Sequence, residues 1–167
     1  SLLDTVGSGG MATVYRGYDH RLRVNRAVKV LAPSYAEHTM NAAVTQEGAP
    51  FPLVIRAHGF GGFNADSTSL SGHVASHGYI VVAPTFPLTN FYMDAADRDL
   101  LDVGEQALDV AFLIDTVLAW NEEPGNAFYG KVDASRIACN GHSLGGATCL
   151  LAGFHPTHGD ARIGAIA

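Results

Sequence analysis

Short apolar runs alternate with longer helical segments through most of the chain. The runs are rich in β-branched and small apolar residues and occupy residues 53–57, 79–83, 136–140 and 162–167. The segments typical of helices occupy residues 67–77, 102–120 and 144–153. Short apolar strands that alternate with helices indicate a parallel sheet covered on both faces. The pattern therefore predicts an α/β fold.

The first 38 residues follow a different pattern. Strand-like pieces lie at residues 2–6, 13–17 and 26–31, and a glycine cluster separates the first two. Basic residues outnumber acidic ones here, whereas the rest of the chain is acidic. Such asymmetry predicts two units of different origin. We expect a β-rich unit over residues 1–38, a linker over residues 39–50 and an α/β unit over residues 51–167.

Composition narrows the classes of protein. The 167 residues are 47% apolar and 16% charged, which is enough apolar material for a buried core. The net charge of -6 argues against a general nucleic-acid binder. No apolar run approaches the roughly 18 residues that span a bilayer. Two cysteines, Cys139 and Cys149, are too few for a disulfide framework and are expected to be free and buried. The pair His155 and His158 lacks an acidic cluster, so no metal site is expected.

The sequence G-H-S-L-G-G at residues 141–146 carries the strongest chemical signal. It matches G-x-S-x-G and stands between an apolar strand and an apolar helix, as a nucleophile elbow requires. The elbow would present the hydroxyl of Ser143 above the sheet, with the backbone N–H of Leu144 as an oxyanion donor. Gly141 and Gly145 would allow strand and helix to approach closely. The alternative is a glycine-rich turn with an incidental serine.

A second glycine-rich loop, H-G-F-G-G at residues 58–62, directly follows the first strand of the α/β unit. In a hydrolase of this kind, a loop at this place supplies the second oxyanion donor, here the backbone N–H of Phe60. A flexible glycine turn is the alternative. Together with the elbow, the loop predicts acyl transfer by a serine nucleophile.

Residues from about 50 to 167 resemble the α/β-hydrolase superfamily, in particular its branch of dienelactone hydrolases, lipases and platelet-activating-factor-acetylhydrolase-like enzymes. The matching pieces, in order, are P-F-P-L-V-I-R-A-H-G-F-G-G, S-H-G-Y-I-V-V-A-P, D-V-G-E-Q-A-L-D-V-A-F-L-I-D and V-D-A-S-R-I-A-C-N-G-H-S-L-G-G-A-T. The resemblance implies hydrolysis of a small-molecule or lipid ester without a cofactor. It implies Ser143 as nucleophile and Phe60 and Leu144 as oxyanion positions. His58, Gly59, Gly141, His142 and Gly145 are the supporting motif residues.

The catalytic partners of Ser143 are missing from the pattern. The superfamily order is Ser, then Asp, then His, so both partners are expected beyond residue 167 in a hydrolase domain cut short. His155 and His158 lie at the far end of the helix, roughly 15 Å from Ser143 by helical rise. The aromatic residues Phe86, Phe91 and Tyr92 follow the second strand. They are candidates for lining a substrate pocket, with ordinary loop packing as the alternative.

The front of the chain resembles the first three strands of a bacterial-type Ser/Thr protein kinase. The sequence V-G-S-G-G-M-A-T-V-Y-R-G is followed by R-A-V-K-V-L. The resemblance implies that Gly7 and Gly9 approach the phosphates of ATP/Mg, that Val14 covers the adenine and that Lys29 reaches the phosphates. It would favour the cytoplasm. No further kinase motif follows, so an ATP-binding fragment and a non-catalytic truncated fusion fragment both stay open as alternatives.

Overall fold

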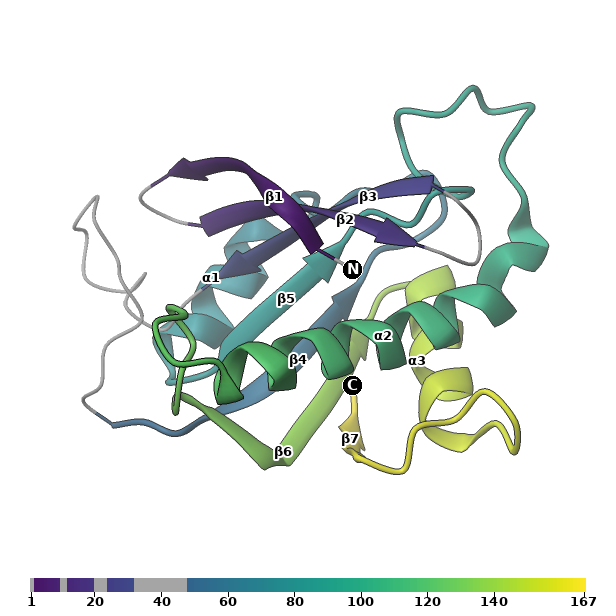
Figure 1. The fold of residues 1–167 in the computed structure, drawn as a ribbon. Coiled ribbons are helices and arrows are strands. Elements are labelled where there is room, and N and C mark those ends of the chain that lie inside the picture. Colours follow the sequence, from purple (N-terminus) through teal and green to yellow (C-terminus); the bar gives the residue numbers. More distant parts are fainter. Residues whose placement is uncertain (1, 10–11, 20–23, 32–47) are drawn as a thin grey trace.

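A single seven-stranded sheet organises the protein (Figure 1). The computed structural model describes residues 2–9, 12–19, 24–31 and 48–167. The strands are β1 (Leu2–Gly9), β2 (Ala12–Asp19), β3 (Val24–Leu31), β4 (Phe51–Ala57), β5 (Ile80–Pro84), β6 (Val132–Gly141) and β7 (Ile163–Ile166). Their order across the sheet is β1-β2-β3-β5-β4-β6-β7. The four strands β5, β4, β6 and β7 run parallel, and each of β1, β2 and β3 pairs antiparallel with its neighbours.

Helices cover both faces of the parallel strands. They are α1 (Thr68–Ser76), the 3-10 turn η2 (Leu100–Asp102), α2 (Val103–Glu122) and α3 (Leu144–Phe154). Leu53 and Ile55 of β4 belong to the main core together with α2 and α3. Val54 points to the other face and packs with Ala75 of α1. Because β4 is buried on both faces, its sequence is a continuous apolar run. The predicted α/β fold is confirmed, as Figure 1 shows.

The first three strands extend this same sheet. β3 pairs antiparallel with β5, and Lys29 lies opposite Ala83 in that pairing. Gly7 and Gly9 lie in β1, paired with β2, so the backbone at these glycines is part of a strand ladder. The predicted boundary at residue 38 and most of the predicted linker over residues 39–50 lie within residues 32–47, which are outside the described residues. The division into units therefore stays a prediction.

The two cysteines differ from the prediction. Cys139 of β6 and Cys149 of α3 form a disulfide with a Cα–Cα distance of 5.4 Å, and both are fully buried. The expectation of free thiols is wrong, because α3 folds back against the strand that leads into it. That reversal brings together two residues ten positions apart in sequence. Within the described ranges, no helix has the length and apolar character needed to cross a membrane.

Candidate active site

The site lies where β4 and β6 end side by side. The two strands pair in parallel, and Ala57 at the end of β4 lies opposite Gly141 at the end of β6. The backbone N–H of His142 donates to the carbonyl of Ala57 across this edge, at 3.4 Å. Ligands of parallel α/β sheets bind outside the carboxyl ends of the strands. The pairing therefore brings the two glycine-rich loops of the sequence to the usual position of a ligand site.

Ser143 occupies a sharp turn between β6 and α3. Its φ of 56° and ψ of -119° make it the one non-glycine residue with positive φ in the described part of the chain. A side chain in such a region costs of order 1–3 kcal/mol and persists only where the surrounding structure imposes it. The serine is exposed, and α3 begins at the next residue, Leu144. The strand–turn–helix context expected of an elbow is present.

Glycines permit this turn. A Cβ on Gly141 would collide with the backbone of Gly145, and it would lie 2.6 Å from the Gly146 nitrogen. A Cβ on Gly145 would collide with the carbonyl of Ala57, and it would lie 2.7 Å from the carbonyl oxygen of His58. All of these obstacles are backbone atoms, which no side-chain movement removes. The first turn of α3 is thus pressed directly against β4 and β6.

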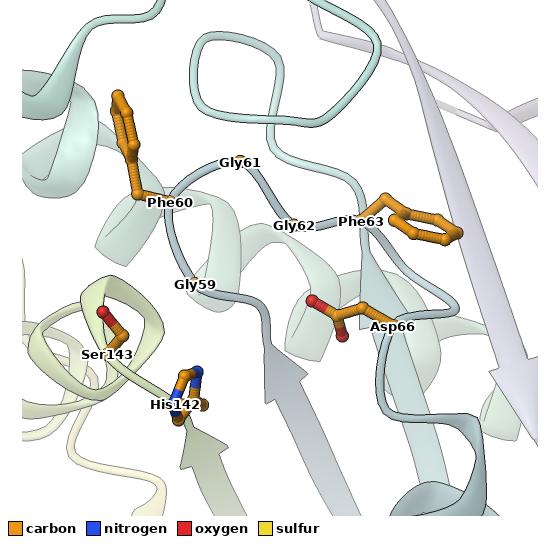
Figure 2. Close-up of a pocket in the computed structure, with 8 residues that line it drawn as sticks. All are labelled: Gly59, Phe60, Gly61, Gly62, Phe63, Asp66, His142 and Ser143. Carbon is orange, nitrogen blue, oxygen red and sulfur yellow. The ribbon is translucent and has the colours of Figure 1, made fainter. Parts of the chain in front are cut away.

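The loop after β4 passes directly beside the serine (Figure 2). A Cβ on Gly59 would lie 3.4 Å from the Cβ of Ser143 and 3.3 Å from the carbonyl oxygen of His142. Within the described residues, neither the backbone N–H of Phe60 nor that of Leu144 donates a hydrogen bond to another protein group. The first N–H groups of a helix lack intrahelical acceptors, which explains the free N–H of Leu144. Two unused donors therefore flank the turn that holds Ser143.

His58 anchors this loop to the segment that follows β5. Its ring is 2% exposed, and its Nε2 accepts a hydrogen bond from the backbone N–H of Phe86 at 2.9 Å. A backbone N–H can only donate, so the ring proton is on Nδ1, which donates to the carbonyl of Gly59 at 2.8 Å. Burial lowers the pKa of His58 below its ordinary value of 6.5, against the opposing effects of the Gly59 carbonyl and the negative charge of Asp66. The neutral ring thus links Gly59 of the loop to Phe86 after β5.

The bonding of His58 predicts a pH-dependent stability. Because the folded-state pKa lies below 6.5, the unfolded chain takes up this proton first as the pH falls. The contribution of His58 to stability is complete above about pH 6.5 and is lost as the pH falls through the folded pKa. We expect the urea concentration at the unfolding midpoint to decrease as the pH is lowered from 6.5. The decrease should be smaller in His58→Asn, which has no titrating ring. Parallel pH profiles of the two proteins would contradict this assignment.

A pocket of about 330 Å³ opens beside Ser143. Its walls are Gly59, Phe60, Gly61, Gly62, Phe63, Asp66, His142 and Ser143 (Figure 2). Phe60 is exposed and Phe63 is half-buried, so the pocket offers apolar surface next to the free backbone donors. The carboxylate of Asp66 is the acidic group of the lining. The arrangement suits an uncharged carbonyl compound with an apolar substituent.

Comparison with known proteins identifies the family. The family model described as chlorophyllase matches residues 12–157 of this chain. The chain belongs to the chlorophyllase family. The match begins inside the segment that resembles a kinase, and no comparison supports a kinase N-lobe. The kinase-like interpretation of Gly7, Gly9, Val14 and Lys29 is therefore not supported.

Single relatives agree with membership in this α/β-hydrolase family. The platelet-activating factor acetylhydrolase of Cavia porcellus is 30% identical over 139 residues, covering 62% of this chain and 32% of that protein. A ferulic acid esterase from Streptomyces cinnamoneus matches with a TM-score of 0.56 and 24% identity, covering 83% of this chain and 50% of that one. Acetyl xylan esterase 1 from Thermoanaerobacterium sp. matches with a TM-score of 0.55 and 20% identity, covering 90% and 46%. The chain spans half or less of the length of these proteins.

The three aromatic residues after β5 divide into two groups in this chlorophyllase-family chain. Phe86 is fully buried and packs on His58 with ring centroids 5.0 Å apart. It therefore serves in loop packing and does not line the pocket. Phe91 and Tyr92 are exposed, and their rings lie 6.0 and 5.6 Å from that of Phe63. The backbone N–H of Phe91 donates to the carbonyl of Gly62 at 2.9 Å. Phe91 and Tyr92 therefore extend the apolar surface outward from the pocket wall.

The histidines that follow α3 form no hydrogen bond with Ser143 in the described structure. His155 and His158 follow the far end of the helix, and their rings stack with centroids 4.6 Å apart. In the described part of the chain, no hydrogen bond joins the Ser143 hydroxyl to a histidine or to an acidic side chain.

The sequence does not single out Asp66 or Phe63 as pocket residues, because they follow the motif by a few positions and carry no spacing signal of their own.

Proposed function

We propose that this chain carries the nucleophile and the oxyanion hole of a serine carboxylic-ester hydrolase. Ser143 is the nucleophile, and the backbone N–H groups of Phe60 and Leu144 are the oxyanion donors. The observation that carries the proposal is the positive φ of Ser143 at a turn flanked by two unused backbone donors. Membership in a family of ester hydrolases supports the same reaction.

The chemistry follows from these positions. The Ser143 oxygen attacks the ester carbonyl carbon, and the negative charge that develops on the carbonyl oxygen is held by the two backbone donors. Collapse of the tetrahedral intermediate releases the alcohol and leaves an acyl-serine, which water hydrolyses to the carboxylic acid. A general base takes the serine proton and returns it to the departing alcohol oxygen; the proposal places this base outside the described residues, among which no hydrogen bond joins the Ser143 hydroxyl to a histidine. The glycines at 59, 141 and 145 keep the loop and the turn close together.

The apolar pocket wall favours esters with an apolar acyl or alcohol group. Phe60 and Phe63 line the pocket, and Phe91 and Tyr92 continue the surface outward. A small-molecule or lipid ester is therefore the proposed substrate class, and no step of the reaction requires a cofactor. The matched enzymes, an acetylhydrolase and two esterases, have names that agree with this class.

The decisive test is covalent labelling of the serine. A fluorophosphonate probe is expected to modify Ser143 slowly, because an oxyanion hole without the complete triad leaves about 10³–10⁴-fold of catalysis over water. Ser143→Ala should abolish the modification completely, while Ser69→Ala, at an exposed serine of α1, should leave it unchanged. Peptide mass spectrometry locates the label. Labelling that survives in Ser143→Ala would refute the assignment of the nucleophile.

A further inference from the structure

A buried glutamine, Gln106 of α2, bonds both to α3, the helix that follows Ser143, and to the loop after β5. Gln106 of α2 is fully buried, and its side chain contacts residues from three segments. Its Nε2 donates to the Thr89 hydroxyl at 2.8 Å and to the Asp102 carboxylate at 3.3 Å. Its Oε1 accepts from the Thr148 hydroxyl of α3 at 2.7 Å. One amide group thus joins α2, α3 and the loop after β5.

The orientation of this amide is fixed by its partners. A carboxylate accepts and does not donate, so the atom that faces Asp102 must be the Nε2 of Gln106. The Oε1 therefore faces Thr148, whose hydroxyl also lies 3.1 Å from the carbonyl oxygen of Leu144. Both N–H groups and the carbonyl oxygen of the amide have partners. A buried network in which each group is bonded is rigid and specifies one arrangement.

The network ends beside both proposed oxyanion donors, at the carbonyl of Leu144 and at the N–H of Gly61. On one side, Thr148 lies one helical turn after Leu144, the residue that carries the first donor. On the other side, the carbonyl of Thr89 accepts a hydrogen bond of 2.7 Å from the backbone N–H of Gly61. Gly61 follows Phe60, the residue that carries the second donor. Thr89 is fully buried, so its hydrogen bonds at this end of the network are shielded from water.

We propose that Gln106 is a positioning residue that sets the spacing between the two oxyanion donors. The inference rests on the proposed function for its catalytic meaning. In the structure, the Gln106 amide connects Thr89, which accepts the Gly61 hydrogen bond, to Thr148 in the first turns of α3. Loss of the amide leaves the buried Thr89 and Thr148 hydroxyls without this partner and lets the loop shift relative to the helix. A displacement of 1 Å within an active site lowers the rate by about 10²-fold.

The experiment compares four variants of the full chain. Gln106→Leu removes all three hydrogen bonds of the amide at similar volume, and Thr148→Val removes the hydroxyl alone. Thr148→Ser keeps the hydroxyl and serves as the conservative rescue. Thr116→Val is the matched control, because the Thr116 hydroxyl bonds the Phe112 carbonyl within α2 and bonds to no other element in the described part of the chain.

Two measurements distinguish the coupling between the Gly61 loop and α3 from the proposed ester hydrolysis. Hydrogen exchange of the Gly61 amide reports the coupling directly, and kinetics with an activated soluble ester report its catalytic consequence. We expect Gly61 exchange to accelerate about tenfold or more in Gln106→Leu and Thr148→Val, and to stay unchanged in Thr148→Ser and Thr116→Val. We expect kcat to fall by roughly 10- to 100-fold with little change in KM, because a misplaced donor weakens the transition state and not substrate binding.

The outcomes are distinct. Unchanged Gly61 exchange in a folded Gln106→Leu or Thr148→Val protein overturns the coupling. Exchange that accelerates equally in Thr116→Val also overturns it, because general loosening of α2 would then be the cause. Accelerated exchange in a chain whose Ser143 reacts with no ester supports the coupling and refutes the proposed function. If Gln106→Leu does not fold, the pair Thr148→Val and Thr148→Ser decides the question alone.

Discussion

Gly145→Ala is expected to destabilise the protein by about 3 kcal/mol and to eliminate the reactivity of Ser143. The added methyl group would enter the space held by the Ala57 and His58 carbonyls, at the contact between the first turn of α3 and the end of β4. The helix must move away from the strand to accommodate it. That movement separates Leu144 from Phe60, so stability and labelling should be lost together. Urea unfolding and fluorophosphonate labelling measure the two effects.

The neighbouring glycine supplies the control. A Cβ on Gly146 would lie 3.6 Å from the carbonyl oxygen of Gly141, which is an ordinary contact. Replacing a helical glycine by alanine adds roughly 0.5–1 kcal/mol of stability where there is room. Gly146→Ala should therefore be neutral or slightly stabilising and should label normally. Equal unfolding midpoints for the two alanine variants would show that α3 does not press on β4 as described.

Loss of the Cys139–Cys149 disulfide is expected to lower the free energy of unfolding by roughly 2–3 kcal/mol, the value for a short closed loop. The bond links residues ten positions apart, one on each side of the Ser143 turn. It restricts the unfolded chain in the same segment that must adopt the positive φ of the serine. Both cysteines are fully buried, so Cys139→Ala with Cys149→Ala also removes packing in the core.

Reduction distinguishes the crosslink from the packing. A dithiol reductant during urea unfolding should lower the midpoint of the natural protein and leave that of the double alanine variant unchanged. The difference between the two reduced proteins then gives the packing contribution alone. A midpoint of the natural protein that does not respond to reductant would mean that the crosslink does not constrain the unfolded chain.

The sequence predicted those parts of the fold whose signals are local. Runs such as residues 53–57 and 79–83 are apolar throughout because both faces of β4 and β5 are covered, and this signature needs no knowledge of neighbours. The strand–turn–helix around Ser143 was predicted in the same way, from glycines at fixed offsets. The type of each predicted helix and strand is therefore correct, whereas the end of β1 and the start of β6 differ by three or four residues and the 3-10 turn η2 was not predicted.

Features that depend on pairing were not visible in the sequence. The glycine spacing at Gly7 and Gly9 suits a kinase loop and also an ordinary hairpin, and only the pairing of β3 with β5 shows which sheet receives these strands. The disulfide could not be predicted, because its two cysteines meet only when α3 folds back against β6. Gln106 carried no signal, because a lone glutamine in an apolar helix is informative only when its partners on other elements are known.

The adjacency of β4 and β6 also governs when the site can appear as the protein folds. Arg56 of β4 bonds to Asn140 of β6, 84 residues later in the chain, and the two glycine-rich loops sit immediately beyond this pair. Closing so long a segment carries an entropic cost that hairpin and helix formation avoid, and contacts of this kind form slowly. The turn at Ser143 can form locally with α3, but the loop that carries the proposed donor Phe60 reaches it only when β4 and β6 pair in register. We therefore expect the proposed site to form late in folding, after the helices and hairpins.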